Sequence, residues 1–430
     1  MDDFRVTREH SLTSVWLAPT LPLQFAFRGY VQCADWSPTV LDLVEIAGAI
    51  LLADRLVRRP AGQWGTRHLG LEVPVRDPIF WNSLGNTLSH TLATLTDDQF
   101  SFWFYRAAEK DPPRRKQVLA RHTAAKVALF SGGLDSGAAA ASFAHSSIDV
   151  IYVTHYTTGL RHIQGLLRDI CVTCGQESIP PHAQFYMIPQ KSIASKLAEN
   201  SRLTRPFFFG SLALATAILA GAAEVCICEN GPLAINLPLT PAMVPTKHAH
   251  SRFLSAMQHL AVAIFDKEIR FQNPFELRTK GEMARIFAPH PELALRTNSC
   301  WNRQFSGRGT GYGQGHCGHC IPCLVRYMSL QAAGIAIPEG HFDIDIMGLV
   351  RLQHETDQAQ PLLAGYRALM MFCEKVSECQ DWREFIQRFP MIVETESTIG
   401  AVAPQEWYNS VHQMMSRFTD EFFQAFERRD

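Results

Sequence analysis

The sequence predicts an α/β protein built on a doubly wound parallel sheet, with an α+β accessory domain before the sheet and a helical region after it. Three observations support this fold class. At 127–144 an apolar strand runs through a Ser/Gly turn into an alanine-rich helix, strand-like and helix-like segments alternate as far as residue 271, and four cysteines with metal-ligand spacing follow. We expect domains at 1–122, 123–345 and 346–430.

The composition is that of a globular protein. Hydrophobic residues make up 47% of the 430 residues, charged residues 19%, and the formal net charge is −1, so no overall field would attract nucleic acid. The polar N-terminus offers no secretory signal, and the apolar stretch 207–228 contains Glu224 and Gly221, which favours a buried helix and a strand over a membrane span. We expect a cytoplasmic protein without membrane or nucleic-acid partners, whose clustered cysteines bind metal rather than form disulfides.

Residues 1–122 carry no recognisable motif. Apolar alternation predicts strands at 14–17, 23–27, 70–75 and 100–105, and helical periodicity predicts helices at 39–58 and 81–95. The polar, proline-bearing segment 109–116 is expected to be a solvated linker that ends the domain, with a contact to nucleic acid as the alternative.

The turn at the end of the first parallel strand is typical of a phosphate site. Ser131-Gly-Gly-Leu-Asp-Ser136 follows the strand 127–130, and backbone N–H groups at such a turn converge with the positive end of the helix dipole. No lysine follows the glycines, which excludes the common Gly-x4-Gly-Lys phosphate loop. The alternative is an ordinary glycine-rich connection between a strand and a helix.

The rest of the alternating region places polar residues where ligands collect in such sheets. Strands are expected at 149–154, 184–188, 225–229 and 269–271, and helices at 163–174, 207–220 and 251–263. Because ligands bind at the carboxyl ends of parallel strands, we expect His155, Glu229 and Asn230 to contact the substrate. The proline-rich segment 231–245 is expected to be a substrate-binding loop, and Thr279 to cap a helix that contains Lys280.

Four cysteines form a C-x16-C-x2-C-x2-C pattern: Cys300, Cys317, Cys320 and Cys323. Thiolates at these spacings predict a structural tetrahedral zinc site. An iron–sulfur cluster and four unliganded thiols are the alternatives, and His316 or His319 could replace one thiolate. A second pair, Cys171 and Cys174, has no partner pair and is interpreted as core packing.

The turn resembles the pyrophosphate loop of the N-type ATP pyrophosphatases, which have the adenine nucleotide α hydrolase-like fold. Further motifs recur in the order of the QueC-type 7-cyano-7-deazaguanine synthases, over about residues 123–335. They are Arg161-His162, Asn273-Pro-Phe, Thr279-Lys280, Ser299-Cys300-Trp-Asn and Cys317-Gly-x-Cys-x-x-Cys-x-x-Arg326. The chain therefore resembles this family.

The resemblance implies a site for ATP and Mg²⁺ and one structural Zn²⁺. ATP would be held by Phe130, Ser131, Gly132, Gly133, Leu134, Asp135 and Ser136. Asp135 would lie near the magnesium, Lys280 or Arg205 would stabilise the departing pyrophosphate, and Arg161 and His162 would line the nucleotide or substrate end. These five residues are the expected catalytic set.

Two departures distinguish the chain from free-standing synthases. Gly159-Leu-Arg-His162 replaces the family's Gly-Gln-Arg-His, and Gly231-Pro-Leu-Ala-Ile-Asn-Leu-Pro replaces the family's substrate segment. With its long N-terminal region, the chain resembles a divergent QueC-like branch found in bacterial antiphage defence operons. This resemblance implies that the acid is joined to an amine of a partner protein instead of ammonia.

We therefore expect an AMP-forming carbon–nitrogen ligase. It would adenylate a small carboxylate, with 7-carboxy-7-deazaguanine as the expected acid, and transfer the acyl group to ammonia or to a partner-protein amine. The alternatives are a tRNA-modifying thiolase or ligase, in which Cys171 or Cys174 would be the reactive thiol, a 7-cyano-7-deazaguanine synthase of queuosine biosynthesis, and a non-catalytic scaffold.

Overall fold

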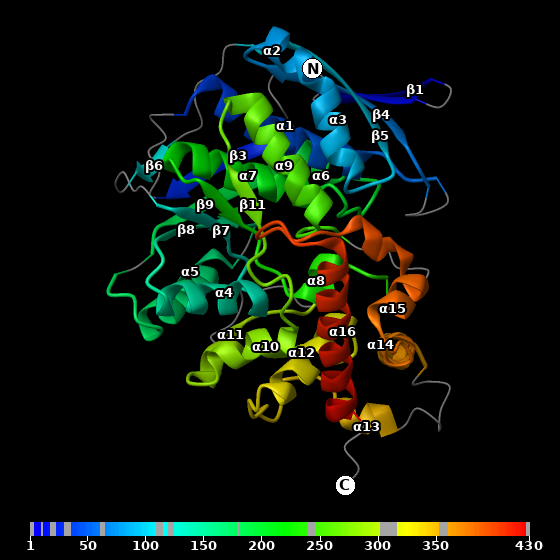
Figure 1. Cartoon of the computed structure of the whole chain (residues 1–430). Helices are drawn as coiled ribbons and strands as arrows, with labels where there is room; N and C mark the ends of the chain where they lie inside the picture. The colour runs from blue at the N-terminus through cyan, green and yellow to red at the C-terminus, as the bar shows by residue number, and fades with distance from the viewer. Residues whose placement is uncertain are drawn as a thin grey trace.

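The structure is a computed structural model that describes residues 4–9, 12–17, 23–29, 36–60, 65–108, 115–118, 124–157, 159–178, 180–238, 246–301, 316–351 and 360–426. These residues form an α/β protein with two sheets and a helical C-terminal part (Figure 1). Most of the predicted linker 109–116 and the segment 239–245 of the predicted proline-rich loop lie outside the described residues.

A four-stranded sheet is formed by the N-terminal region. Its order is β1(Phe4–Glu9), β2(Leu12–Leu17), β4(His68–Val75), β5(Gln99–Arg106), with β1 and β2 antiparallel and the other pairs parallel. The helix expected over 81–95 is divided into α2(Pro78–Ser83) and α3(Gly85–Ala93). The division has a visible cause, since Asn82 near the end of α2 exchanges hydrogen bonds of 2.9 and 3.0 Å with the backbone of Phe104 in β5.

The larger sheet has the order β11-β10-β7-β8-β9-β3-β6. Its strands are β3(Leu23–Gly29), β6(Arg115–Val118), β7(Lys126–Leu129), β8(Val150–His155), β9(His182–Pro189), β10(Glu224–Cys226) and β11(Arg270–Gln272). The five strands from β11 to β9 are parallel, but β3 is antiparallel to β9. The sheet is therefore mixed rather than wholly parallel, because a strand of the N-terminal region extends it. The domain boundary at 122 stays a prediction.

Helices cover both faces of the larger sheet (Figure 1). One core contains the strand residues Val127, Ile151 and Val225 with α1(Pro38–Leu56), α7(Arg205–Ala220) and α9(Ser251–Phe265). The opposite core contains the neighbouring residues Ala128, Tyr152 and Cys226 with α4(Leu134–His145), α5(Leu160–Thr173), α10(Lys280–Ala284) and α11(Pro291–Arg296). Successive strand residues point to opposite faces, so both faces must be apolar, which explains the nearly continuous apolar runs in the sequence.

The long apolar stretch 207–228 divides as predicted. Helix α7 ends at Gly221, whose φ of 69° is in the left-handed region that favours glycine, and β10 follows. Within the described ranges, no helix is both long enough and apolar enough to span a bilayer.

The C-terminal part is helical, as the sequence predicts. Its helices are α12(Ile321–Ala332), α13(Ile346–Arg351), α14(Gln360–Ser377), α15(Trp382–Arg388) and α16(Pro404–Phe426). They enclose a third apolar core, and α16 packs against α12 and α14 and against α8(Gly231–Ile235) (Figure 1). This helix thereby reaches the carboxyl end of the larger sheet.

Candidate functional site

The turn between β7 and α4 has the geometry of an anion-binding loop. Gly132 has a φ of 77°, a backbone conformation that residues other than glycine rarely adopt. Among the described residues, no side chain caps the start of α4 at Gly133. The hydroxyl of Ser136 folds back over the turn, donating to Gly133 O at 3.2 Å and accepting from Ser131 N at 3.3 Å. The turn is thus fixed internally while the first N–H groups of a twelve-residue helix remain at its mouth.

Asp135, in the first turn of α4, is the centre of a buried charged group. Its Oδ2 accepts from Lys280 Nζ at 2.6 Å and from Asn230 Nδ2 at 3.3 Å, and the two charged residues are only 7% and 6% exposed. Its Oδ1 is buried and has no hydrogen-bond partner among the described residues. A buried carboxylate oxygen without a partner is costly in a protein interior, which makes this atom a good candidate ligand for a cation.

Glu229 is the second carboxyl group at this point. Burial and the negative charge of Asp135 raise the pKa of Glu229 to about 8, and the positive charge of Lys280 opposes that rise. The charges of two carboxyl groups and one ammonium therefore act on one another here, with Glu229 partly exposed. Binding of a divalent cation there would favour the ionised form of both acids.

Glu229 and Asn230 lie in a loop, because β10 ends at Cys226 instead of continuing to residue 229. Asn273 holds this loop: its Nδ2 donates to Glu229 O at 2.8 Å and its Oδ1 accepts from Glu229 N at 3.3 Å. The Oδ1 of Asn230 caps α8 by accepting from Leu233 N at 3.3 Å. The nitrogen and the oxygen of the Asn230 side-chain amide both have partners within the protein, so this residue orients Asp135 and caps α8. Its contact with substrate stays a prediction.

The C-terminal helix fixes Lys280. Thr279 forms the predicted cap, a capping box with Glu282, and its hydroxyl also donates to Glu421 Oε1 of α16 at 2.5 Å. Glu421 Oε2 accepts from Gly281 N at 3.3 Å, and a side chain at Gly281 would collide with that carboxyl group. The lysine is therefore held by a helix that begins more than a hundred residues later.

His155 and Arg205 form a separate group on the α7 face of the sheet. His155 Nε2 lies 2.9 Å from Met187 O, and the guanidinium of Arg205 lies 4.9 Å from the ring centre of Phe209. His155 contacts Phe208 and Phe209 edge-on or tilted, and the ring of His248 stacks on Phe209. Burial lowers the pKa of both histidines to about 4, with the charge of Arg205 acting in the same direction, so both rings are neutral at pH 7.

Arg161 and His162 begin α5 and do not join either group. Arg161 is exposed, while burial and the positive charge of Arg296 lower the pKa of His162 against a backbone hydrogen bond with Arg296 that raises it. Within the described residues, neither forms a hydrogen bond or ion pair with Asp135 or Lys280. Their expected catalytic roles stay predictions.

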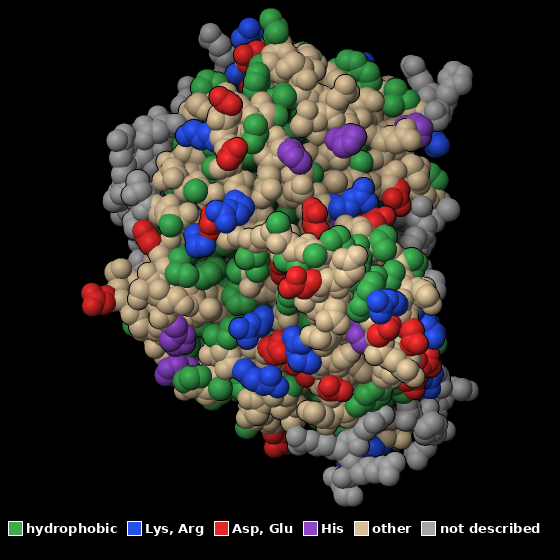
Figure 2. Space-filling model, in the orientation of Figure 1, with side chains coloured by type: hydrophobic (Ala, Val, Ile, Leu, Met, Phe, Trp, Pro, Cys, Tyr) green, Lys and Arg blue, Asp and Glu red, His purple; other side chains and the backbone are tan. Residues whose placement is uncertain are grey.

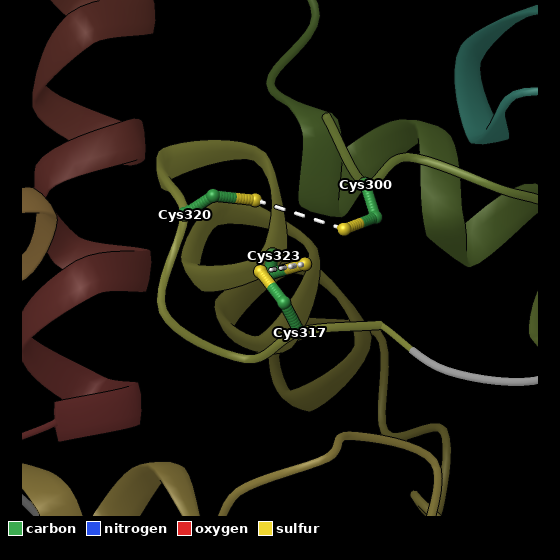
Figure 3. A group of neighbouring side chains, drawn as sticks. All are labelled: Cys300, Cys317, Cys320 and Cys323. Carbon is green, nitrogen blue, oxygen red and sulfur yellow. Dashed lines mark hydrogen bonds between the residues drawn. The ribbon is translucent and has the colours of Figure 1, made fainter. Parts of the chain in front are cut away.

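The four cysteines come together as a compact cluster. Cys300 approaches from one segment, whereas Cys317, Cys320 and Cys323 surround the start of α12 (Figure 3). All four Sγ atoms lie within 4.8 Å of one another, with Cys300–Cys320 at 4.0 Å and Cys317–Cys323 at 3.8 Å. A tetrahedral site with Zn–S bonds of about 2.3 Å requires S···S separations of about 3.8 Å, so this donor set fits zinc.

The chemistry of the cluster also favours metal binding. A hydrogen bond from Cys323, together with backbone N–H groups of Trp301 and Cys323, lowers the pKa of Cys320 to about 5, whereas the contact with Cys320 and burial raise the pKa of Cys323. Cys320 is therefore the thiol that ionises first, and a thiolate is the form that binds metal. His316 is turned elsewhere, since its Nε2 lies 3.4 Å from Ser299 N and its ring stacks on His341 at 4.8 Å. Among the described residues, these four cysteines are the group that could hold a metal ion.

A short connection joins the cysteine cluster to the turn after β7. Cys300 N donates to Asn298 Oδ1 at 2.9 Å, and Asn298 N donates to Gly132 O at 3.0 Å. Arg326 of α12 is fully buried beside it and donates to Thr297 Oγ1 and Ala294 O, each at 2.8 Å. The segment that carries the first cysteine is therefore also a wall of the turn.

Two residues that hold the candidate site, Glu421 and Asn298, could not be assigned from sequence motifs. Glu421 is the only acidic residue among the buried residues described in α16, most of which are apolar, such as Phe418, Phe422 and Ala425. An acidic residue at such a position must find a buried partner, and this is the signal that the sequence contains. Asn298 precedes the motif Ser299-Cys300 and gives no comparable signal.

Charges of both signs are interspersed over the face of the molecule shown in Figure 2. In the comparisons with known proteins, neither the family models nor the curated proteins gave a match to this chain.

Proposed function

We propose that this chain is an ATP-dependent ligase that activates a carboxylate as an acyl-adenylate and transfers the acyl group to an amine. One observation carries the proposal: the glycine turn after β7 opens directly onto Asp135, whose Oδ2 is fixed by Lys280 while its buried Oδ1 lacks a partner among the described residues. Convergent N–H groups suit phosphate oxygens, and the adjacent free carboxylate oxygen suits the magnesium that accompanies ATP.

The proposed reaction has two steps. A carboxylate oxygen attacks the α-phosphorus of ATP, the bond to the β-phosphate breaks, and pyrophosphate leaves with the bonding electron pair. An amine nitrogen then attacks the acyl carbon, AMP leaves, and the amine loses a proton. Lys280 and the turn at 131–136 would stabilise charge on the departing pyrophosphate, and Asp135 with Glu229 would hold Mg²⁺, which screens the phosphate oxygens.

The strand arrangement supports the doubly wound class to which we assign the parallel part of the sheet. The first strand, β7, is central, with β8 and β9 on one side and β10 and β11 on the other. In such sheets ligands bind at the carboxyl ends of the strands where the order reverses, which here lies between β7 and β10. Asp135, Glu229 and Asn230 follow those two strands.

The thiolase alternative is less well supported. Cys171 in α5 and Cys174 at its C-terminal cap are buried, and burial raises the pKa of both thiols, that of Cys171 to about 12. A nucleophilic cysteine needs a low pKa and access to substrate. We therefore favour a ligase with a structural zinc ion over a sulfur-transfer enzyme.

The identity of the acid and of the amine rests on the sequence resemblance. The motifs shared with QueC-type synthases suggest 7-carboxy-7-deazaguanine as the acid, and the divergent segment after Glu229 suggests a partner-protein amine besides ammonia, in antiphage defence. Intact masses of candidate partners after incubation with enzyme, ATP and acid distinguish the two acceptors. A partner that gains the acyl mass identifies a protein amine, whereas amide or nitrile formed only with ammonia identifies a synthase.

The test of the activity is the bond that is cleaved. With ATP and the acid, the wild-type protein should release AMP and pyrophosphate, and Asp135→Asn should lose at least about 100-fold of that rate while remaining folded. Asp266→Asn is the matched control, since Asp266 is exposed at the left-handed end of α9, a conformation that asparagine tolerates. Release of ADP and phosphate by the wild type would overturn the proposal.

A further inference from the structure

Three arginines meet where α1 ends and α7 begins. Thr204, just before α7, donates through its hydroxyl to Asp54 Oδ2 of α1 at 3.0 Å, which brings Arg55 and Arg205 to neighbouring positions. Arg205 N also donates to Arg202 O at 3.3 Å, so the three arginines belong to one junction of the chain. Burial, and after it the positive charges of Arg202 and Arg55, lowers the pKa of Arg205.

The neighbouring acids do not neutralise this arginine group. Asp54 is paired with Arg59 and Arg67 in a buried network that Asp98 completes. The carboxylate of Glu199 accepts backbone N–H groups, from Arg59 at 3.1 Å and from Asn200 at 3.0 Å. In the described ranges, no ion pair involves Arg55, Arg202 or Arg205. Gathering like charges without a counter-charge is unfavourable unless an anion joins them.

A flat aromatic surface adjoins the guanidinium of Arg205. That group lies over Phe209 at 4.9 Å, and the ring of His248 lies 6.3 Å from Phe209 at an interplanar angle of 29°. His155 closes the group, 5.8 Å from Phe209. Because a carbonyl can only accept, His155 Nε2 must donate to Met187 O, which leaves Nδ1 of the neutral ring as an acceptor.

This group lies beside the proposed nucleotide site. His155 directly follows Thr154, whose hydroxyl donates to Phe130 O at 2.6 Å, just before the glycine turn. The strands β7 and β8 that end at these residues are paired neighbours, about 5 Å apart. A molecule bound at Arg205 would therefore be at the same edge of the sheet as the phosphates.

We propose that Arg205, supported by Arg55 and Arg202, binds the carboxylate of a planar heteroaromatic acid whose ring lies against Phe209 and His248. This inference rests on the proposed function and names the place where its acid is recognised. A guanidinium pairs with a carboxylate through two parallel hydrogen bonds and leaves one face free for stacking, and His155 Nδ1 would accept a ring N–H of the acid. The bound anion supplies the missing counter-charge.

The test compares two ligands of nearly the same shape, 7-carboxy-7-deazaguanine and its neutral carboxamide, by calorimetry without ATP; the amide lacks the negative charge and one acceptor oxygen. The wild type should bind the acid at least 10-fold more tightly than the amide. Arg205→Gln should abolish that preference, Arg205→Lys should retain part of it, and ATP affinity should be unchanged in both. Arg168→Gln, at an exposed arginine of α5 that pairs with Asp169, is the control and should behave as wild type.

A second variant protects the test against misfolding of the first. Arg202 is exposed, so Arg202→Gln should fold and should lower the preference for the acid about 2-fold to 5-fold by removing one supporting charge. The inference is overturned if the wild type does not prefer the acid, if Arg205→Gln retains the preference, or if that change weakens ATP binding instead.

The same preparations separate this inference from the proposed function. If the protein releases AMP and pyrophosphate but its preference for the acid does not depend on Arg205, the proposed ligase activity is supported and the proposed acid-binding site is overturned. If the preference for the acid depends on Arg205 but no pyrophosphate is released, the proposed acid-binding site is supported and the proposed ligase activity is overturned.

Discussion

Asn298 donates a hydrogen bond from its backbone N–H to the carbonyl of Gly132 at 3.0 Å, and its side-chain oxygen accepts from Cys300 N at 2.9 Å. One residue thus contacts the cysteine cluster with its side chain and the glycine turn with its backbone. Metal binding at the cysteines and the shape of the turn should depend on each other, because both are fixed by the segment 297–300.

Replacement of one cysteine should remove the metal and weaken nucleotide binding together. Purified wild-type protein should contain about one zinc per chain, and Cys320→Ser should lose zinc, solubility and ATP affinity because four thiolates are needed for a tetrahedral site. Elemental analysis and ATP titration measure these losses. Cys379→Ser is the control, since Cys379 Sγ only donates to Lys375 O at 3.3 Å, a bond that serine can replace. Iron in place of zinc would contradict the prediction.

Removal of the Asn298 side chain should separate the two functions of this segment. Asn298→Ala keeps the backbone hydrogen bond to Gly132 but removes the acceptor for Cys300 N. Zinc should remain, because all four thiols are kept. ATP affinity should fall about 3-fold to 10-fold, the effect of one hydrogen bond, because the segment that holds the turn is less well fixed. Amide hydrogen exchange at 131–136 should accelerate. Unchanged exchange with unchanged affinity would show that the turn is independent of the segment.

Loss of the Lys280 ammonium should destabilise the fold. Lys280→Met leaves Asp135 and Glu229 as buried acids without a cation, which we expect to cost about 3–5 kcal/mol of unfolding free energy. Denaturant titration measures this loss, and the double variant with Asp135→Asn should recover part of it. Arg388→Met breaks the exposed pair with Glu378 and should change stability by less than about 1 kcal/mol. Equal effects at both sites would contradict the buried pairing.

The stability of the fold should depend on pH through Glu421. Burial raises the pKa of Glu421 from 4.5 to about 7, so the folded chain binds this proton more tightly than the unfolded chain. The stabilisation that the folded chain gains from protonated Glu421 is fully present below about pH 4.5 and is lost as the pH rises through 7. The unfolding free energy should fall by up to about 3 kcal/mol over that range.

Glu421→Gln should remove this dependence, so that the variant gains stability relative to wild type between pH 5 and pH 8. Thermal or urea unfolding across that range measures the difference, and Glu406→Gln, exposed on the same helix, should leave the wild-type pH profile unchanged. A stability difference that does not vary with pH would refute the assignment.

The sequence by itself determined the local structure and the residues that can do chemistry. Apolar alternation and helical periodicity report directly on burial, which is why the strands and helices of the α/β region, the Thr279 cap and the helical C-terminal part were predictable. The four cysteines were predictable because thiolate spacing in a chain reflects the geometry of a tetrahedral metal. The glycine turn was predictable because glycine is the residue that most readily adopts a left-handed conformation such as that at residue 132.

Only the tertiary structure decided which of these residues act together. It joined β3 to β9 in the larger sheet, brought Lys280 but not Arg205 to Asp135, and brought Glu421 of α16 to Thr279 and Gly281, the residues before and after the lysine. It also connected Asn298 to Gly132. Such contacts join residues up to 166 positions apart, as between Leu23 and Pro189. They depend on how whole elements pack, which no local pattern of side chains reports.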